Sequence, residues 1–322
     1  MGIGLASIGC AAESRAALER AARLDPSLSG ASLFLVRALL EAGDREGAVR
    51  EARRAVLLAP ETAALHLELH RALFDDRDPS AAIEAAERAV ALDPTWELAR
   101  LQWGAALALA GMVEPARRAH DALSARAAAP LDAVRYALEH RGGATRFFAS
   151  SRETLLFALE EATERGPVLE FGVRHGTSTR ILADHADALH AFDSFRGLPE
   201  PWYGRAAGAF TTAGEVPDLP AGVELHVGLF ADTLPAYVAR GDRPPRLIHV
   251  DSDLYSSARD VLTLLAPSIG PGCVLVFDEY IGNDRWREDE HRAFGEAVRA
   301  YGFRYRYLAF NWFTGQAVVR ID

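Results

Sequence analysis

The chain has 322 residues, a formal net charge of −10 and 49% hydrophobic residues, which is ordinary for two soluble domains with a core each. The acidic charge argues against general binding to nucleic acid or to anionic membranes. Cys10 and Cys273 supply neither a disulfide framework nor a zinc site, and no apolar run reaches the roughly 20 residues of a membrane span. The first ten residues lack the basic start of a signal peptide, so we expect a cytoplasmic protein.

The first 126 residues have a period of 34. Pro26, Pro60 and Pro94 recur at that interval, and each lies two residues after a leucine. Alignment on these prolines brings small residues into register, namely Ala48 with Ala82 and Ala55 with Ala89. This length, with small residues where paired helices cross and a proline after each second helix, resembles the tetratricopeptide repeat family.

The resemblance implies an all-α array of about three units over residues 1–126. Such arrays bind a protein or peptide on a concave surface, or they pair subunits. A generic alanine-rich helical bundle is the alternative. Residues 127–145, with Pro130, Gly142 and Gly143, predict a linker made of a helix and a hinge.

Residues 146–322 alternate strands with helices. Strands are expected at residues 168–172, 189–193, 223–228, 246–251, 273–277, 304–310 and 316–321. Helices are expected at residues 151–165, 177–185, 231–240, 256–268 and 287–301. This order predicts a Rossmann-like α/β domain whose seven-stranded sheet is parallel except for an antiparallel C-terminal hairpin. Sites in such sheets lie at the carboxyl ends of the strands.

A glycine loop follows the first long strand of this domain. Gly172 and Gly176 let the backbone approach a ligand, but their spacing differs from the Gly-x-Gly-x-x-Gly of dinucleotide sites. Asp193 closes the next strand about 20 residues later, where a carboxylate can accept hydrogen bonds from ribose hydroxyls. The alternative is a structural turn followed by a helix-capping aspartate.

Four carboxylates follow the fourth and fifth strands. Asp251 and Asp253 come after the fourth, and Asp278 and Glu279 come after the fifth. Adjacent parallel strands lie about 4.8 Å apart, so these side chains should converge at one edge of the sheet. Crowded carboxylates repel each other, and a divalent cation with oxygen ligands, usually Mg²⁺, removes that repulsion. A hydrogen-bonded acidic network without a metal is the alternative.

Three blocks, residues 170–178, 192–199 and 228–235, resemble the macrocin O-methyltransferase family. Members of that family methylate sugar hydroxyls on macrolides and related natural products. The resemblance runs from about Phe147 to the end of the chain and implies a class I methyltransferase domain. It also implies S-adenosylmethionine and Mg²⁺ as cofactors, and a small hydroxyl-bearing molecule as the acceptor.

The resemblance also implies a role for individual residues. Those around the cofactor would be Glu170, Gly172, Gly176, Thr177, Ser178, Asp193, Ser194, Phe195, Gly228, Phe230 and Asp232. Within this set Glu170 and Gly172 would flank the methionine part, Asp193 the ribose and Asp232 the adenine edge. The metal ligands would be Asp251, Asp278 and Glu279, with Asp253 as the general base. Two positions depart from the family, which usually has Glu at Arg196 and Asp at Glu279.

The chemistry fits these residue types. An alcohol is a poor nucleophile at neutral pH, so a metal that lowers its pKa and a carboxylate that takes its proton both help methyl transfer. Residues 199–222 contain Trp202, Tyr203 and Phe210 and predict either a lid over the acceptor pocket or a plain surface loop. Two further functions stay open. One is methylation of a carrier-bound or peptide substrate recruited by the repeats, and the other is a non-catalytic adaptor.

Overall fold

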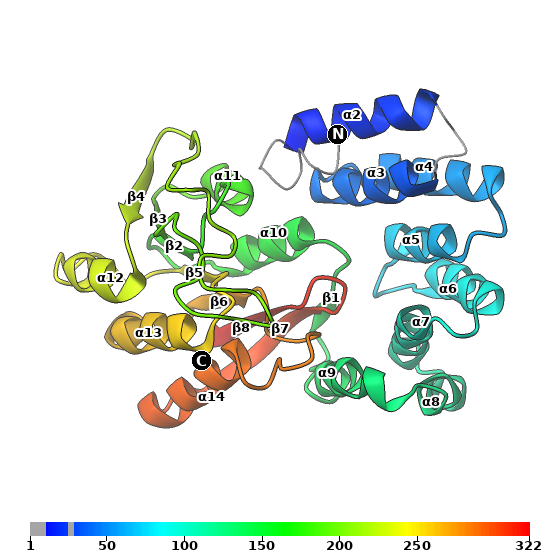
Figure 1. Ribbon diagram of the computed structural model, residues 1–322. Coiled ribbons are helices and arrows are strands. Elements are labelled where there is room, and N and C mark those ends of the chain that lie inside the picture. Colours follow the sequence, from blue (N-terminus) through cyan, green and yellow to red (C-terminus); the bar gives the residue numbers. More distant parts are fainter. Residues whose placement is uncertain (1–10, 25–28) are drawn as a thin grey trace. The chain divides into compact units, whose positions relative to one another are not determined.

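The computed structural model describes residues 11–24 and 29–322 (Figure 1). The chain forms two compact units. Unit 1 contains the residues up to His140 together with Arg146–Glu153 and Asn311–Phe313, and unit 2 contains Arg141–Thr145, Thr154–Phe310 and Thr314–Asp322. Cys10 and Pro26 lie outside the described residues. Within the described part of the chain, the helices are all too short or too polar to cross a membrane.

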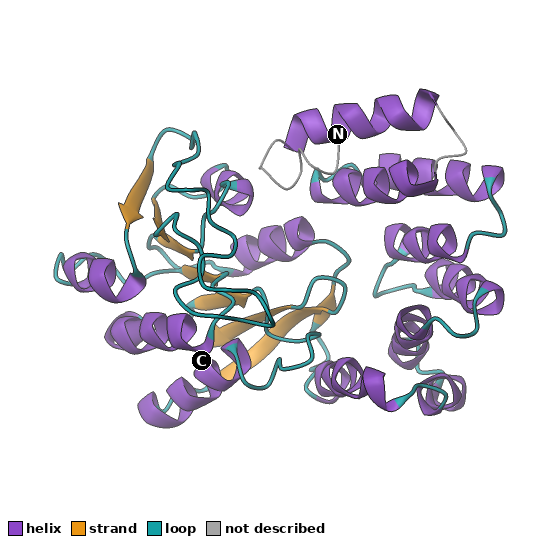
Figure 2. Cartoon of the chain, viewed as in Figure 1, coloured by secondary structure: helices purple, strands orange, loops and turns teal. Residues whose placement is uncertain are grey.

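Unit 1 consists mainly of helices that follow one another in pairs (Figure 2). Its α-helices are α2 (Ala11–Leu24), α3 (Ser29–Glu41), α4 (Arg45–Leu58), α5 (Ala63–Leu73), α6 (Ser80–Leu92), α7 (Glu97–Leu109), α8 (Val113–Asp121) and α9 (Ala128–Glu139). A 3₁₀ helix, η1 (Ala125–Ala127), precedes α9. The helices α3, α5 and α7 begin 34 residues apart, so the period in the sequence is a period of helix pairs.

Small residues allow these helices to pack closely. Ala48 and Ala82, at equivalent positions of α4 and α6, are 0% exposed, and Ala55 and Ala89 are buried in the same two helices. Alanine at these positions keeps the helix axes close without any loss of helix propensity. Gly43, with φ +81°, forms the turn between α3 and α4, where a left-handed backbone favours glycine.

Unit 2 has a central sheet with helices on both faces (Figure 1). Its strands are β2 (Val168–Phe171), β3 (Leu189–Asp193), β4 (Val223–Val227), β5 (Leu247–Val250), β6 (Val274–Phe277), β7 (Tyr305–Asn311) and β8 (Gln316–Ile321), in the order β7-β8-β6-β5-β2-β3-β4. Its helices are α10 (Ser151–Glu161), α11 (Thr177–Ala183), α12 (Phe230–Val238), α13 (Tyr255–Leu265) and α14 (Glu290–Tyr301), with a 3₁₀ turn η2 (Ala266–Ser268). The first residues of α10 and the last residue of β7 are assigned to unit 1.

The sheet is parallel from β6 through β4, and β8 pairs antiparallel with β6. The mixed α/β architecture is the one that the alternating pattern predicts. An eighth strand, β1 (Arg146–Phe147), belongs to unit 1, and the predicted count of seven strands omitted it because two residues carry no periodic pattern.

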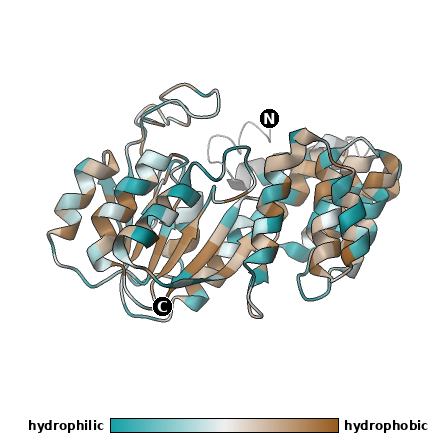
Figure 3. Ribbon diagram, turned by 90° about the horizontal axis from the view of Figure 1, so that it is seen from below, coloured by the Kyte–Doolittle hydropathy of each residue, from teal (hydrophilic) through white to brown (hydrophobic). Residues whose placement is uncertain are grey.

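The core of unit 2 lies along the central strands. All four residues of β2, β5 and β6 are buried, which explains why these segments are almost continuously apolar (Figure 3). The edge strand β4 is more exposed and carries polar side chains. The helix predicted at residues 256–268 ends earlier, at Leu265, because Pro267 has no backbone N–H and the last turn tightens into η2.

Candidate active site

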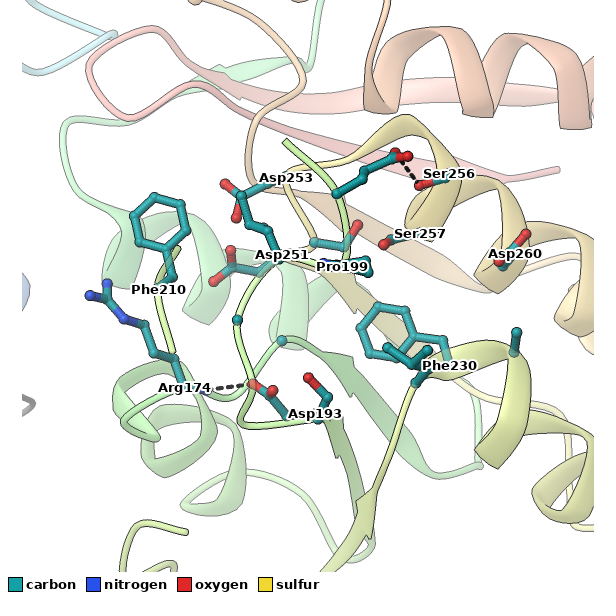
Figure 4. A pocket seen from close by; sticks show the side chains of 18 of the residues that line it. Arg174, Asp193, Pro199, Phe210, Phe230, Asp251, Asp253, Ser256, Ser257 and Asp260 are labelled. Atoms are coloured by element: carbon teal, nitrogen blue, oxygen red, sulfur yellow. Dashed lines mark hydrogen bonds between the residues drawn. The ribbon is translucent and has the colours of Figure 1, made fainter. Parts of the chain in front are cut away.

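A cavity of about 530 Å³ opens at the carboxyl ends of the parallel strands of unit 2 (Figure 4). Its walls include Gly172 after β2, Asp193 at the end of β3, Asp251 after β5 and Asp278 after β6. These positions coincide because Phe171 is in register with both Phe192 and Val250, and Val250 with Phe277. The site therefore follows from the sheet topology, as expected for parallel α/β folds.

The loop after β2 is held by the carboxylate of Asp193. One carboxylate oxygen, Oδ2, accepts the backbone N–H groups of Val173 at 2.8 Å and Arg174 at 2.7 Å, and Oδ1 accepts that of Phe195 at 2.7 Å. Gly172, with φ +106°, has no room for a Cβ, which would overlap the carbonyl oxygen of Asp251. Asp193 thus shapes the loop at the cavity wall, and its Oδ1 atom, which accepts one N–H group where Oδ2 accepts two, keeps a further lone pair.

The acidic residues after β5 and β6 meet as the sequence predicts. Ligand atoms of Asp251, Asp278 and His249 all lie within 4.8 Å of one another. Glu279 also lines the cavity, and its Oε2 atom is buried without a hydrogen-bond partner among the described residues. Hard carboxylate oxygens at this spacing, one of them unpaired, are a donor set that suits Mg²⁺.

Burial and mutual repulsion raise the pKa values of several carboxyl groups in this cluster. Burial first, and then repulsion from Asp278, raise the pKa of Asp251 and of Glu279 well above their usual ranges. The same two causes raise the pKa of Glu290 to about 8. Carboxyl groups in this condition resist ionisation, and a bound cation would favour their charged form.

The sequence reasoning missed Glu290 and His249. Glu290 comes from α14, is 0% exposed, and accepts hydrogen bonds from the backbone N–H of Ser252 at 3.3 Å and of Glu279 at 3.1 Å. It therefore joins the two acidic segments from a third element. Only its position near the start of a helix could have indicated it, and that signal is common.

His249 is a buried cation between two carboxylates. Its Nδ1 lies 3.4 Å from Glu170 Oε1 and its Nε2 lies 3.6 Å from Asp278 Oδ1. Burial alone would lower its pKa, but contacts with Asp278 and Glu170 outweigh burial and raise the pKa to about 10. The register of β2 with β5 places His249 opposite Glu170. Glu170 is thus buried beneath the cavity, where it neutralises the histidine.

Asp253 has an unusual backbone. Its φ of +60° lies in the left-handed region, which non-glycine residues rarely occupy and which recurs at functional sites. Its side chain lines the cavity beside Asp251 (Figure 4). Burial and repulsion from Asp278 raise its pKa to about 6, while the positive charges of Arg205 and Arg174 act in the opposite direction.

The excursion at residues 199–222 contributes to the cavity. Its residues Pro199, Glu200 and Phe210 line the cavity, as does Leu198 directly before it. Two guanidinium groups flank the Phe210 ring, with that of Arg174 at 5.0 Å and that of Arg205 at 4.7 Å from its centroid. Two cations, those of Arg174 and Arg205, therefore lie near Asp253. The sequence alone did not indicate them.

Two aromatic side chains of the excursion are anchored. The Trp202 Nε1–H group donates to Asp289 Oδ2 at 3.2 Å, and the Tyr203 hydroxyl donates to Asn283 Oδ1 at 2.7 Å. The excursion therefore covers part of the cavity and is bonded to the segment that precedes α14.

The predicted site residues fall into two groups. Those that line the cavity are Gly172, Asp193, Ser194, Gly228, Phe230, Asp251, Asp253, Asp278 and Glu279. Those that do not line it are Glu170, Gly176, Thr177, Ser178, Phe195 and Asp232. In the second group, Gly176, Thr177 and Ser178 form the start of α11, Phe195 is packed against Val173 and Ala191, and Asp232 lies in the first turn of α12.

One family model matches part of unit 2. Residues 169–280, which contain the glycine loop and both acidic segments, match the Methyltransf_24 family, described as a methyltransferase domain. A search of curated proteins found no match. The matched segment ends at Tyr280, directly after Asp278 and Glu279.

Several solved structures are similar in part. The calicheamicin methyltransferase CalS11 is 23% identical, with a TM-score of 0.40, covering 53% of this chain and 77% of that one. The O-methyltransferase NovP is 19% identical, with a TM-score of 0.42, covering 53% and 80%. A thermophilic TPR protein of Thermus thermophilus, TTC0263, is 21% identical, with a TM-score of 0.36, covering 42% and 77%.

Proposed function

We propose that the protein is an S-adenosylmethionine-dependent, Mg²⁺-dependent O-methyltransferase that acts on a hydroxyl group of a sugar or polyhydroxylated natural product. The observation that carries this proposal is the convergence of Asp251, Asp253, Asp278 and Glu279 on the cavity that Gly172 and Asp193 also line. A binding pocket alone would not need four carboxylates at this spacing, because their mutual repulsion lowers stability.

The cofactor would occupy the part of the cavity near β2, β3 and β4. Gly172 and Gly228 present backbone without side chains there, and the Phe230 ring, packed edge-on against Phe171 at 5.3 Å, adds an apolar surface. Asp193 and Ser194 supply polar groups at the end of β3. When bound, S-adenosylmethionine supplies an electrophilic methyl group. The chain's own task is to orient the acceptor oxygen toward it and to exclude water.

The metal ligands would be Asp251, Asp278 and Glu279. When bound, Mg²⁺ supplies a positive charge that lowers the pKa of an acceptor hydroxyl. The Oδ1 atom of Asp278 accepts a hydrogen bond from the amide of Gln316 and also lies 3.6 Å from Nε2 of His249. These neighbours fix the carboxylate in place, as second contacts of metal ligands commonly do.

Asp253 would take the hydroxyl proton. Its pKa of about 6 leaves the carboxylate mostly ionised at neutral pH, so it can act as a general base. The left-handed backbone and the nearby charges of Arg174 and Arg205 hold and stabilise that carboxylate. Its role differs from that of the metal ligands, because it accepts a proton and does not bind the metal ion.

The helices of unit 1 would form a tetratricopeptide-type array that binds a protein partner or pairs subunits. The support is the 34-residue spacing of α3, α5 and α7 and the buried alanines between them. A second candidate function follows from this unit, namely methylation of a carrier-bound or peptide acceptor that the array recruits. A non-catalytic adaptor is disfavoured by the intact acidic cluster.

The test is methyl transfer by the intact protein. The protein is incubated with tritiated S-adenosylmethionine and a panel of glycosylated and polyhydroxylated acceptors, free and carrier-linked, with Mg²⁺ or with excess chelator, and cofactor binding is measured separately by calorimetry. We expect labelled product only with Mg²⁺, and restoration when Mg²⁺ is added back. Equal turnover in chelator would contradict the metal proposal. Activity restricted to carrier-linked acceptors would favour recruitment by unit 1, and absence of cofactor binding would leave only the adaptor.

A further inference from the structure

A second cluster of metal-ligating side chains lies outside the cavity, on β3 and β4. It consists of His190, Glu224 and His226, whose ligand atoms lie within 4.8 Å of one another. The register explains the cluster, because His190 is paired with Glu224, and His226 is two residues further along β4. Residues two apart on a strand share a face, so all three side chains lie on the same side of the sheet. The three residues are absent from the cavity wall.

We propose that His190, Glu224 and His226 form a binding site for a divalent transition metal ion, with Zn²⁺ as its representative. The Nδ1 atom of His190 lies 3.3 Å from Nε2 of His226 and 3.5 Å from Oε2 of Glu224, and Nε2 of His226 lies 3.6 Å from Oε1 of Glu224. Ligands about 2.0–2.1 Å from a tetrahedral Zn²⁺ are separated by about 3.3–3.4 Å. The two imidazole nitrogens thus already have the spacing of two ligands of such an ion, and the Glu224 carboxylate presents one oxygen to each of them.

The protonation state of the histidines suits a metal. Burial lowers the pKa of both His190 and His226, more than the nearby Glu224 raises it. Neutral imidazoles at pH 7 keep a lone pair free for a metal. Two imidazoles with one carboxylate are also a ligand set of zinc and iron sites, whereas Mg²⁺ prefers oxygen alone.

An aromatic side chain and the solvent border the cluster. The Tyr237 ring of α12 packs on His190 at 4.9 Å and on His226 at 5.8 Å between centroids. Its hydroxyl is buried without a hydrogen-bond partner among the described residues. Glu224 is 48% exposed, so an ion can enter from solvent.

The positive charge of Arg240 disfavours a metal ion at this cluster. Its guanidinium pairs with Glu224, but its Nε also pairs with Asp242 Oδ2 at 3.1 Å. A carboxylate has four lone-pair positions, so Glu224 can accept Arg240 and still ligate a metal. Asp242 keeps the arginine neutralised in either state. The metal would tie the edge strand β4 to β3 below α12.

The test uses intact protein freed of metal by a chelator and then kept in excess Mg²⁺, which would compete with Zn²⁺ for the carboxylates of the cavity. Zn²⁺ is titrated by calorimetry, and Co²⁺ is added separately to record its visible absorption, which is strong in tetrahedral sites. We expect one Zn²⁺ per chain and a Co²⁺ spectrum of the tetrahedral type. His226→Ala and Glu224→Gln should each weaken Zn²⁺ binding by at least about tenfold.

Two control variants separate this site from other parts of the chain. His185→Ala removes an exposed histidine of the same unit, and Asp251→Asn alters the cavity; both should keep the bound Zn²⁺. Because Glu224 is half exposed, Glu224→Gln keeps the test valid if His226→Ala does not fold. Zn²⁺ binding that is equal in wild type and Glu224→Gln, or that is lost in Asp251→Asn, would overturn the proposal.

Discussion

Buried carboxylates have different neighbours in the two units. In unit 1, Glu68 accepts the guanidinium of Arg37, and Asp76 accepts Arg146 at 2.7 Å together with the backbone N–H of Phe147 at 2.8 Å. In unit 2, Asp251, Glu279 and Glu290 face further carboxylates, and burial with that repulsion raises their pKa values.

The difference distinguishes structural charges from functional ones. A buried carboxylate paired with arginine holds elements together, and its removal should reduce stability alone. Carboxylates that repel one another lower stability, so their presence calls for a ligand that compensates them. The comparison therefore predicts that substitutions in the two units affect different measurements.

The largest effect is expected from Asp253→Asn. Loss of the general base should reduce kcat about 10²–10⁴-fold, while the affinity for S-adenosylhomocysteine stays nearly unchanged. Asparagine tolerates the left-handed backbone at this position, so the fold should be kept. Single-turnover kinetics and calorimetry measure the two quantities. A kcat within a few-fold of wild type would mean that another group takes the proton.

Asp76→Ala in unit 1 should act on stability instead. It leaves the guanidinium of Arg146 without its carboxylate and should lower the free energy of unfolding by about 2–3 kcal/mol. Urea unfolding measures this change, and kcat/KM well below the unfolding transition should stay the same. A loss of activity in the folded variant would break the division between structural and functional charges.

Asp193→Ala should weaken S-adenosylhomocysteine binding by about 1–3 kcal/mol, because it removes a charged hydrogen-bond acceptor. It also frees the backbone N–H groups of Val173 and Arg174, which shape the loop. Calorimetry with Asp187→Asn, an exposed carboxylate of the same unit, provides the control. Unchanged affinity in Asp193→Ala would exclude this carboxylate from the cofactor site.

The smallest effect concerns pH. Asp251, Glu279 and Glu290 have pKa values raised in the folded state, that of Glu290 to about 8. Such groups stabilise the fold at low pH and lose this contribution as the pH rises from about 4 through their folded pKa values. Metal-free protein should therefore lose stability between pH 5 and about 8, and Mg²⁺ should raise Tm more at pH 8 than at pH 5. An equal Mg²⁺ shift at both values would contradict this linkage.

The sequence indicated most of the sheet and much of the cavity wall, for a physical reason. Strands such as β2, β5 and β6 are apolar because they are buried on both faces, and their carboxyl ends must meet once the sheet is parallel. Asp251 and Asp278 could be placed together from this rule alone.

Other parts of the site depend on contacts that the order of residues does not specify. Glu290 reaches the cluster from α14, and Arg205 reaches Asp253 from the irregular excursion. The hydrogen-bond partners of Asp193 are backbone N–H groups. Almost any residue type supplies such a group, so the sequence does not reveal these contacts. The sequence did not predict strand β1, because a segment of two residues is too short to show the alternation of a strand.

The most direct test of the difference between the two units is a calorimetric titration of Mg²⁺. Wild-type protein, Asp278→Asn and the surface control Asp187→Asn are compared in the presence of S-adenosylhomocysteine. We expect one Mg²⁺ per wild-type chain, the same in Asp187→Asn, and binding at least about tenfold weaker in Asp278→Asn, because a charged oxygen ligand is lost. Equal binding in all three proteins, or no saturable binding to wild type, would contradict a metal site built from the carboxylates of unit 2.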